Sequence, residues 1–265
     1  MSKPSVAELR PVVHPPGVTD RRSGEHWAGR MYMREISLRW TRHLVTTRIT
    51  ANQLTYLMVL AGVAAGAALL VPGVPGAVAA ALLIQLYLLL DCVDGEVARW
   101  RSQTSVTGVY LDRVGHYLAE AALLVGFGLR AAGVLGGEDP APNWLWAFLG
   151  TVAALGAILI KAETDLVDVA RSRAGLPAAG EGAVAPRAAG LALARRAASA
   201  LRFHRLIGGV EASLLILAVA VLDALAGDGA DALFFTRLGV AVLTAIAVVQ
   251  VVLHLVSVLA SSRLR

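Results

Sequence analysis

The chain has 265 residues, of which 57% are hydrophobic and only 16% are charged. This charged fraction is well below the roughly 25% that is usual for soluble globular domains, so the composition excludes a typical soluble domain. The formal net charge of +5 does not require a nucleic-acid partner, because anionic lipid headgroups attract the same basic residues.

The first segments are polar and lack a membrane-spanning run. Residues 1–30 are predicted to form a flexible tail, and residues 31–50 an amphipathic helix on the membrane surface. Apolar side chains recur in this helix at three- and four-residue spacing, with charged residues between them: Met33, Ile36, Trp40 and Leu44. This pattern is typical of interfacial helices. The alternative is an ordinary surface helix that packs on the protein.

Residues 51–262 are predicted to form an all-α, polytopic membrane domain with six transmembrane helices. Apolar runs of membrane-spanning length recur there, and Gly- and Pro-rich turns separate several of them. The predicted spans are residues 53–71, 77–99, 107–130, 143–163, 206–226 and 238–260.

The distribution of Arg and Lys predicts the orientation of these spans. Basic residues are concentrated before the first span, in the second turn, in the loop 164–205 and at the C-terminus, whereas the opposite loops are mostly acidic. Because cytoplasmic loops carry the excess of Arg and Lys, we expect both termini to face the cytoplasm. The expected location is a bacterial cell membrane.

Charged residues recur within the second and third spans, where a membrane helix usually has none. If these spans form an antiparallel hairpin that turns near Gln103, Asp91 lies at the depth of His116, and Asp94 lies at the depth of Asp112. Within each helix these residues are three or four positions apart and therefore share a face. The sequence predicts a polar cleft that opens to the cytoplasm.

Carboxylates at that depth are unfavourable, by at least ~2.5 kcal/mol each on insertion scales, and they also repel one another. A bound cation offsets both effects, and oxygen ligands favour Mg²⁺ or Mn²⁺ over zinc. Two such ions suit phosphoryl chemistry. The alternative is a buried charge network that braces the two helices, with Asp91 or Asp112 paired to Arg99 or Arg113.

Small residues face each other near these carboxylates. Gly95, Ala98 and Gly108 leave room for a base or a phosphate chain to approach the backbone, and Arg99 can contact a phosphate. The full pattern is Asp91-x2-Asp94-Gly95-x2-Ala98-Arg99-x8-Gly108-x3-Asp112-x3-His116. It resembles the signature of the CDP-alcohol phosphotransferases, D-x2-D-G-x2-A-R-x8-G-x3-D-x3-D, and departs from it only at the last position.

A second stretch supports the resemblance. Residues 49–55, Ile-Thr-Ala-Asn-Gln-Leu-Thr, look like the family's entry into its first span, T-P-N-x-x-T, with Ala51 where Pro is common. The resemblance implies a two-metal enzyme that displaces CMP from a CDP-alcohol with the hydroxyl of a second alcohol. It implies the metal ligands Asp91, Asp94, Asp112 and His116, and CDP contacts from Asp94, Gly95, Ala98, Arg99 and Gly108.

His116 replaces the aspartate that the family is thought to use as a base and as a ligand of the second metal. An imidazole titrates near neutral pH, which suits a general base. It is a poorer ligand than carboxylate for Mg²⁺, so the second metal would be weakened or replaced, for instance by Mn²⁺. We expect His116 and Asp112 to act in catalysis; loss of catalysis is the alternative.

The sequence gives less information about the identity of the acceptor alcohol. Family resemblance and position suggest that a phosphate on the acceptor binds to four basic residues: Lys161, Arg171, Arg173 and Arg205. The alternative is that these side chains extend to lipid headgroups. Inositol phosphate is the first candidate acceptor, because the Arg-rich entry resembles the inositol-phosphate branch, and glycerol phosphate is the second.

The expected function is transfer of a substituted phosphoryl group from a CDP-alcohol, such as CDP-diacylglycerol, to an acceptor alcohol or alcohol phosphate. Membrane lipids are expected partners, nucleic acids are not, and a homodimer is one assembly considered. Two other classes stay open: a non-catalytic family member that binds CDP-lipid or metal, and a transporter with an acidic cation site.

Overall fold

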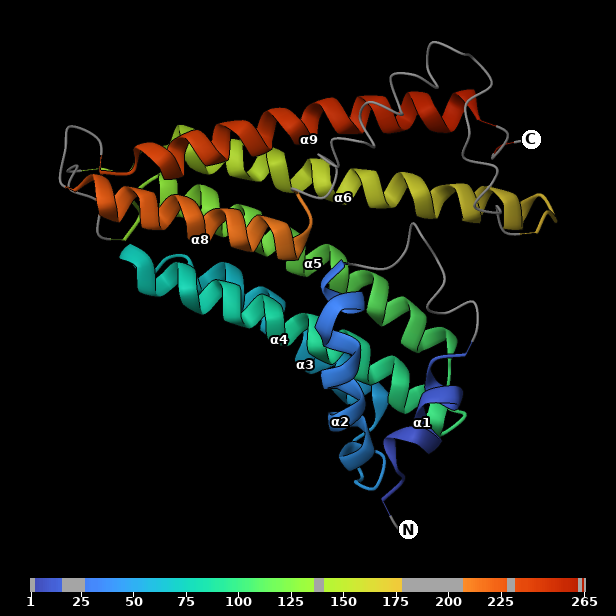
Figure 1. Ribbon diagram of the computed structural model, residues 1–265. Coiled ribbons are helices and arrows are strands. Elements are labelled where there is room, and N and C mark those ends of the chain that lie inside the picture. Colours follow the sequence, from blue (N-terminus) through green and yellow to red (C-terminus); the bar gives the residue numbers. More distant parts are fainter. Residues whose placement is uncertain are drawn as a thin grey trace. The chain divides into compact units, whose positions relative to one another are not determined.

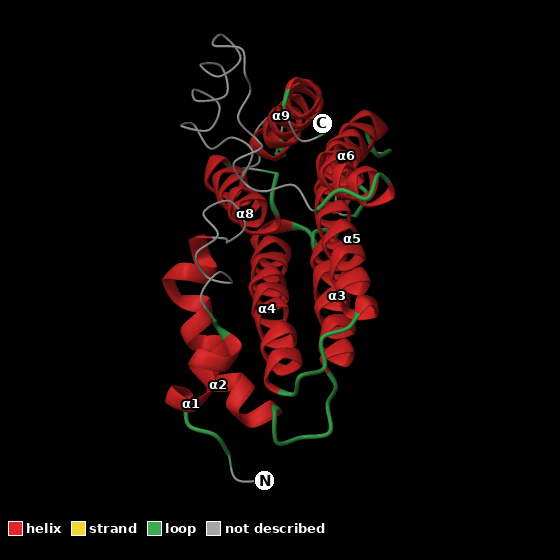
Figure 2. Cartoon of the chain, turned by 90° about the vertical axis from the view of Figure 1, so that its right-hand side faces the viewer, coloured by secondary structure: helices red, strands yellow, loops and turns green. Residues whose placement is uncertain are grey.

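The computed structural model describes residues 3–15, 27–135, 141–177, 207–227, 232–261 and 264. All regular elements in this part of the chain are helical, which confirms the predicted all-α class (Figure 2). The elements are α1 (Val6–Val13), the π-helical turn η1 (Gly29–Met33), α2 (Arg34–Leu44), α3 (Ala51–Ala68), α4 (Gly73–Trp100), α5 (Val106–Ala131), α6 (Trp144–Arg173), α8 (Gly209–Ala226) and α9 (Phe234–Ala260).

Five of the described helices are long and apolar enough to cross a membrane: α3, α4, α6, α8 and α9. Each has at least 18 residues, close to the roughly 20 that span a bilayer core. Helix α5 is long enough, with 26 residues, but it contains four charged side chains: Asp112, Arg113, Glu120 and Arg130. The sixth predicted span therefore stays a prediction.

One helix extends well beyond the end that its hydropathy predicts. Helix α6 was expected to end at residue 163, but it continues to Arg173. Hydropathy marks the end of the apolar run near Ile160, whereas backbone hydrogen bonds extend the helix through charged residues as readily as through apolar ones.

The segment predicted as a flexible tail contains helix α1. Ser5 and Glu8 form a capping box, in which the Glu8 amide donates to Ser5 Oγ and the Ser5 amide donates to Glu8 Oε2, at 3.2 and 2.7 Å. The hydrogen bonds that the Ser5 amide and hydroxyl donate to Glu8 Oε2 lower the pKa of the Glu8 carboxyl. Leu9 and Val13 are fully buried and pack with Leu38 of α2. This contact gives the short helix the tertiary support that its length requires.

The chain divides into two compact units. The first comprises Met1–Ala64 and Leu82–Ala119, and the second comprises Ala65–Ala81 and Glu120–Arg265. The first unit thus contains α1, η1, α2 and the adjoining parts of α3, α4 and α5. The second contains α6, α8, α9 and the remaining parts of those three helices.

The first unit is held together around the α4–α5 hairpin. Its core joins Val45 and Leu54 to Val93 and Val97 of α4. Farther along α3, a methyl group added at Gly62 would lie 2.3 Å from Cβ of Ala119, so the missing side chain lets α3 and α5 approach closely. This packing fixes the relative position of the facing sides of α4 and α5.

Arg101, just after α4, fastens the turn between α2 and α3. Its guanidinium donates to the backbone oxygens of Leu44, Thr47 and Ile49, at 2.9, 2.8 and 2.6 Å. These carbonyl groups belong to the last residue of α2 and to the turn that follows it, where the regular helical hydrogen bonds have ended. The start of α3 is therefore anchored beside the end of α4.

The second unit pairs long helices. Helices α6 and α9 run side by side (Figure 1), and Gly156 of α6 lies against Ala247 of α9. Helix α9 begins where Asp223 of α8 accepts hydrogen bonds from the amides of Phe235 and Thr236, at 2.7 and 3.0 Å. A carboxylate at a helix N-terminus satisfies amides that have no partner within the helix.

Candidate active site

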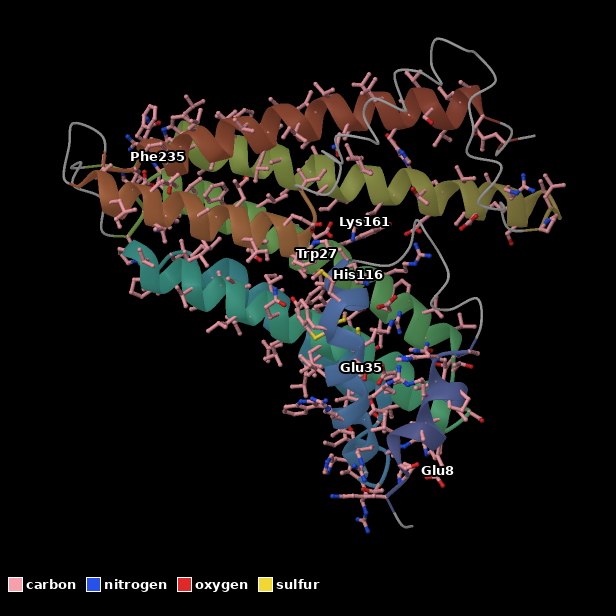
Figure 3. The ribbon with its side chains drawn as sticks, viewed as in Figure 1. Glu8, Trp27, Glu35, His116, Lys161 and Phe235 are labelled. Carbon is pink, nitrogen blue, oxygen red and sulfur yellow. The ribbon has the colours of Figure 1, made fainter. Side chains whose placement is uncertain are left out.

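Three side chains of the first unit converge between α4 and α5. Asp91 of α4 and both Asp112 and His116 of α5 place their potential ligand atoms within 4.8 Å of one another. His116 Nε2 lies 3.3 Å from Asp91 Oδ1 and 3.4 Å from Asp112 Oδ1. The position of His116 on α5 can be followed in Figure 3. The predicted hairpin register, which set Asp91 level with His116, agrees with this contact.

The donor set fits a divalent cation. Two carboxylates and one imidazole nitrogen suit Mn²⁺ or Mg²⁺, with carboxylate preferred by Mg²⁺ and imidazole better tolerated by transition ions. All three side chains are partly exposed, between 26% and 37%, so a substrate oxygen can reach the same point. The arrangement could thus hold an ion while leaving part of its coordination open.

Asp94 is placed differently from the other predicted metal ligands. It is buried, and its Oδ2 accepts a hydrogen bond of 2.6 Å from Thr55 Oγ1 of α3. It is not part of the group formed by Asp91, Asp112 and His116. Its role as a metal ligand stays a prediction, but its carboxylate is held in a fixed orientation one helical turn after Asp91.

Polar side chains lie against the bare backbone at both glycines of the motif. A methyl group at Gly95 would lie 3.1 Å from Nη1 of Arg99, so the guanidinium rests over the bare backbone of Gly95. At Gly108 a methyl group would lie 3.3 Å from Ser105 Oγ and 3.5 Å from Asn52 Oδ1. Ala98 is half-buried on the same helix as Gly95. These features are compatible with the predicted CDP contacts, which stay a prediction.

The entry into α3 contributes polar groups to the same region. Thr50 and Gln53 cap the helix reciprocally: the Gln53 amide donates to Thr50 Oγ1, and the Thr50 amide donates to Gln53 Oε1. Farther along, Asn52 lies near Gly108, and Thr55 holds Asp94. The polar positions of this stretch therefore fix the helix start, approach the α5 glycine and orient a motif carboxylate.

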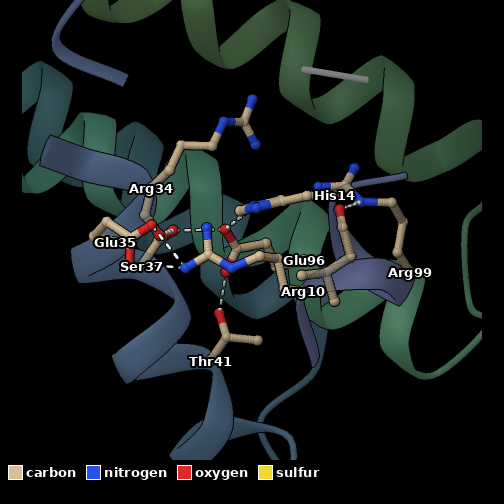
Figure 4. A network of polar contacts seen from close by, with 9 residues as sticks. Arg10, His14, Arg34, Glu35, Ser37, Thr41, Glu96 and Arg99 are labelled. Carbon is tan, nitrogen blue, oxygen red and sulfur yellow. Dashed lines mark hydrogen bonds and ion pairs between the residues drawn. The ribbon is translucent and has the colours of Figure 1, made fainter. Parts of the chain in front are cut away.

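A buried carboxylate beside Gly95 fastens the N-terminal helices to α4 (Figure 4). Glu96 is fully buried; its Oε1 accepts hydrogen bonds from His14 Nε2 at 2.8 Å and Ser37 Oγ at 2.5 Å, and its Oε2 accepts one from Thr41 Oγ1 at 2.6 Å. Next to it, Arg99 Nε donates to the Val13 carbonyl at 2.7 Å. The end of α1 therefore sets the position of the guanidinium that lies over Gly95.

The η1 turn is attached to α4 as well. The Tyr32 hydroxyl donates to Gln85 Oε1 at 2.6 Å. Burial raises the pKa of this phenol above its usual value, although the hydrogen bond to Gln85 opposes the shift, so the hydroxyl stays protonated as the donor.

Helix α2 has one buried face and one exposed face. Ser37, Leu38 and Thr41 are buried, whereas Ile36 and Trp40 are exposed.

Comparison with known proteins identifies the family of this chain. A family model described as CDP-alcohol phosphatidyltransferase matches residues 48–261, most of the chain. The chain belongs to the CDP-alcohol phosphatidyltransferase family. The matched region contains every residue of the α4–α5 motif and the polar entry into α3, so the convergence of Asp91, Asp112 and His116 lies inside the family domain.

Two curated relatives carry the name "Bifunctional IPC transferase and DIPP synthase". The protein from Thermococcus kodakarensis is 29% identical over 143 residues, and the match covers 54% of this chain and 30% of the relative. The protein from Aquifex aeolicus is 30% identical over 146 residues, with the same two coverages. The chain therefore matches less than a third of the length of these relatives.

The predicted acceptor-binding residues of this family member lie in the second unit or outside the described residues. Lys161 Nζ forms an ion pair with Glu120 Oε1 at 3.0 Å. Arg171 Nε donates to the Pro177 carbonyl at 2.8 Å, and Arg173 is exposed at the end of α6. Arg205 lies outside the described residues. Binding of an acceptor phosphate by these residues stays a prediction.

Several residues with a place in the site were not singled out from the sequence. Thr55 belongs to the family-like entry into α3, and its position in that stretch is the available signal. Tyr87 is hydrogen-bonded through its hydroxyl to His116 Nδ1. It lies four residues before Asp91 on the same helix face, so helical spacing is the signal for it. Glu96 and His14 gave no such signal, because their contact joins distant segments of the chain.

Proposed function

We propose that this family member transfers a substituted phosphoryl group from a CDP-alcohol to an acceptor alcohol and releases CMP. In this reaction the acceptor oxygen forms a bond to the phosphorus that carries the alcohol, and the bond from that phosphorus to CMP breaks. The observation that carries the proposal is the convergence of Asp91, Asp112 and His116 inside a domain of the CDP-alcohol phosphatidyltransferase family.

The motif residues have separate roles in this proposal. Asp91, Asp94, Asp112 and His116 would hold Mg²⁺ or Mn²⁺ in two sites, and such ions neutralise and polarise a pyrophosphate when bound. Gly95, Ala98 and Gly108 would admit the CDP moiety, to which Asp94 also contributes, and Arg99 would bind a phosphate oxygen. His116 would accept the proton of the acceptor hydroxyl, with Asp112 beside it.

The substrates are proposed in order. CDP-diacylglycerol is the proposed donor, because the domain has several helices of membrane-spanning character. Inositol phosphate is the first proposed acceptor and glycerol phosphate the second. Both relatives are named as a transferase and a synthase. Because the match covers only 30% of each relative, their names support the proposed class of reaction and not a particular substrate.

The proposed setting is a bacterial cell membrane, with both termini and the motif at the cytoplasmic side. Helix α5 would be the sixth span, with Asp112 grouped with Asp91 of α4 and Glu120 paired with Lys161 of α6. Helix α2 would lie at the interface, because the exposed side chains of Ile36 and Trp40 suit the headgroup region. A homodimer stays a prediction.

The test is CMP release by the purified full-length protein. It would be incubated with CDP-diacylglycerol, Mn²⁺ or Mg²⁺, and a panel that includes inositol phosphate and glycerol phosphate. CMP formed only with an acceptor supports the transferase and identifies the acceptor. The replacement of the last motif aspartate by His116 favours a second candidate, a non-catalytic member; cation binding without CMP from any acceptor would support it.

A further inference from the structure

The side chain of Tyr87 contacts the side of His116 that faces away from the carboxylates. Tyr87 lies on α4, one helical turn before Asp91, and it is only 5% exposed. Its hydroxyl is hydrogen-bonded to His116 Nδ1, and the two rings meet edge to face with their centroids 5.7 Å apart. The other ring nitrogen, Nε2, points to Asp91 and Asp112.

The two nitrogens of this imidazole therefore have different requirements. A neutral ring carries one proton, so one nitrogen donates and the other accepts. Without a cation, the proton belongs on Nε2, where it faces two carboxylate oxygens, and Nδ1 must accept. With a cation between the ligands, Nε2 needs its lone pair, and the single proton belongs on Nδ1, which must then donate.

A tyrosine hydroxyl can satisfy both conditions because it donates and accepts. We propose that Tyr87 is a positioning residue for His116: its hydroxyl holds the imidazole with Nε2 toward Asp91 and Asp112 and matches Nδ1 whether or not that nitrogen carries the ring proton. The ring keeps one proton throughout, exchanged with water, and the tyrosine hydroxyl only rotates. This inference rests on the proposed function, since it places His116 in the cation site.

The surroundings keep Tyr87 in place. A methyl group at Gly62 of α3 would lie 3.2 Å from Cδ2 of Tyr87 and still closer to Ala119 of α5. The bare backbone of Gly62 therefore makes room for the tyrosine ring between α3, α4 and α5. A ring confined in this way can fix the orientation of its partner, as outer partners of metal-binding histidines commonly do.

Phenylalanine at this position would keep the packing and remove the hydrogen bond. The Tyr87→Phe variant should bind Mn²⁺ about 10–100-fold more weakly, the usual effect of removing the outer partner of a ligand histidine. Its kcat for CMP release should fall, while KM for the CDP-alcohol should stay unchanged, because Tyr87 is not among the nearest neighbours of Gly95 or Gly108. Tyr56→Phe is the matched control, since Tyr56 is 58% exposed on α3.

The decisive comparison uses a second background. The aspartate of His116→Asp has no ring nitrogen that the Tyr87 hydroxyl could hold. Adding Tyr87→Phe to this background should therefore change Mn²⁺ affinity less than about threefold. That change is well below the effect of losing the outer partner of a ligand histidine. Mn²⁺ alone would be titrated into the full-length protein, and free Mn²⁺ would be read from its electron paramagnetic resonance signal. This measurement requires no substrate.

The outcomes separate this inference from the proposed function. Weaker Mn²⁺ binding by Tyr87→Phe in the natural background alone supports the positioning role, even if no acceptor yields CMP. Unchanged Mn²⁺ affinity, or an equal loss in both backgrounds, overturns it and makes Tyr87 a packing residue. If the natural protein nevertheless releases CMP, the proposed function stands without this role for Tyr87.

Discussion

The imidazole of His14 donates from Nε2 to the Glu96 carboxylate at 2.8 Å, although 82 positions of sequence separate the two residues. Both side chains are almost completely shielded from solvent, and Ser37 and Thr41 add two further hydrogen bonds to the same carboxylate. This buried acceptor attaches α1 and α2 to the helix that carries the motif, directly beside Gly95.

Glu96→Ala should therefore destabilise the first unit. It leaves the donors of His14 and Thr41 without an acceptor, whereas Ser37 Oγ can still donate to the Arg34 carbonyl. Each unsatisfied buried group costs about 1–3 kcal/mol. The measurements are the melting temperature in detergent and the rate of cleavage after Glu8 by a glutamate-specific protease, which should rise as α1 detaches. Glu35→Gln is the control, because the exposed Arg10–Glu35 pair contributes only about 0–1 kcal/mol. Equal behaviour of the two variants would contradict the anchoring role.

Thr55→Val should reduce turnover without unfolding the protein. The substitution preserves the shape of the side chain but removes the hydroxyl that donates to Asp94. If Asp94 is a metal ligand, losing this outer partner should lower kcat for CMP release on the order of 10–100-fold. Thr55→Ser keeps the hydroxyl and should retain most of the activity. Full activity in Thr55→Val would show that Asp94 needs no such support.

The proposed orientation predicts different accessibility at the two ends of α6. Single cysteines would replace Ala141, before the helix, and Leu176, after it, in a Cys92→Ala background; both positions are exposed. Because the Arg-rich loop should be cytoplasmic, a membrane-impermeant thiol reagent should label intact cells at position 141 only. Labelling at position 176 only would reverse the orientation and place the motif on the outer side.

The sequence was sufficient for features that depend on helix periodicity and bilayer thickness. Long apolar runs indicated helices of spanning length, because a bilayer core leaves few alternatives for the backbone. The contact of Asp91 with His116 followed from equal distances to the turn of an antiparallel hairpin. Asp112 and His116 share a helix face because they are four residues apart.

The features that escaped prediction depend on tertiary contacts. Helix α1 is too short to be stable alone, and its formation relies on the burial of Leu9 and Val13. The capping box of Ser5 and Glu8 was a readable signal for it. The partners of Glu96 come from the end of α1 and from α2, and no spacing within the sequence indicates which polar residue will meet a buried carboxylate.

His116 is the departure from the family motif, and its substitution separates a base from a packing residue. His116→Ala should lower turnover on the order of 10²–10⁴-fold, the usual range for a general base. His116→Asp should retain measurable activity and shift the preference toward Mg²⁺, because carboxylate is the harder ligand. Steady-state rates with each cation provide the comparison. Normal turnover in His116→Ala would mean that another group accepts the proton.

The central claim is that the cluster of Asp91, Asp112 and His116 holds the cation that supports CMP release. The most direct measurement is CMP release from CDP-diacylglycerol by purified full-length protein with Mn²⁺ and the responding acceptor, together with Mn²⁺ affinity. Asp91→Ala should abolish both CMP release and tight Mn²⁺ binding while the protein remains folded, and chelation should stop the natural protein. Asp168→Ala, which removes an exposed carboxylate of α6, should leave both unchanged. Near-normal turnover or unaltered Mn²⁺ affinity in folded Asp91→Ala would contradict the account and place the site elsewhere.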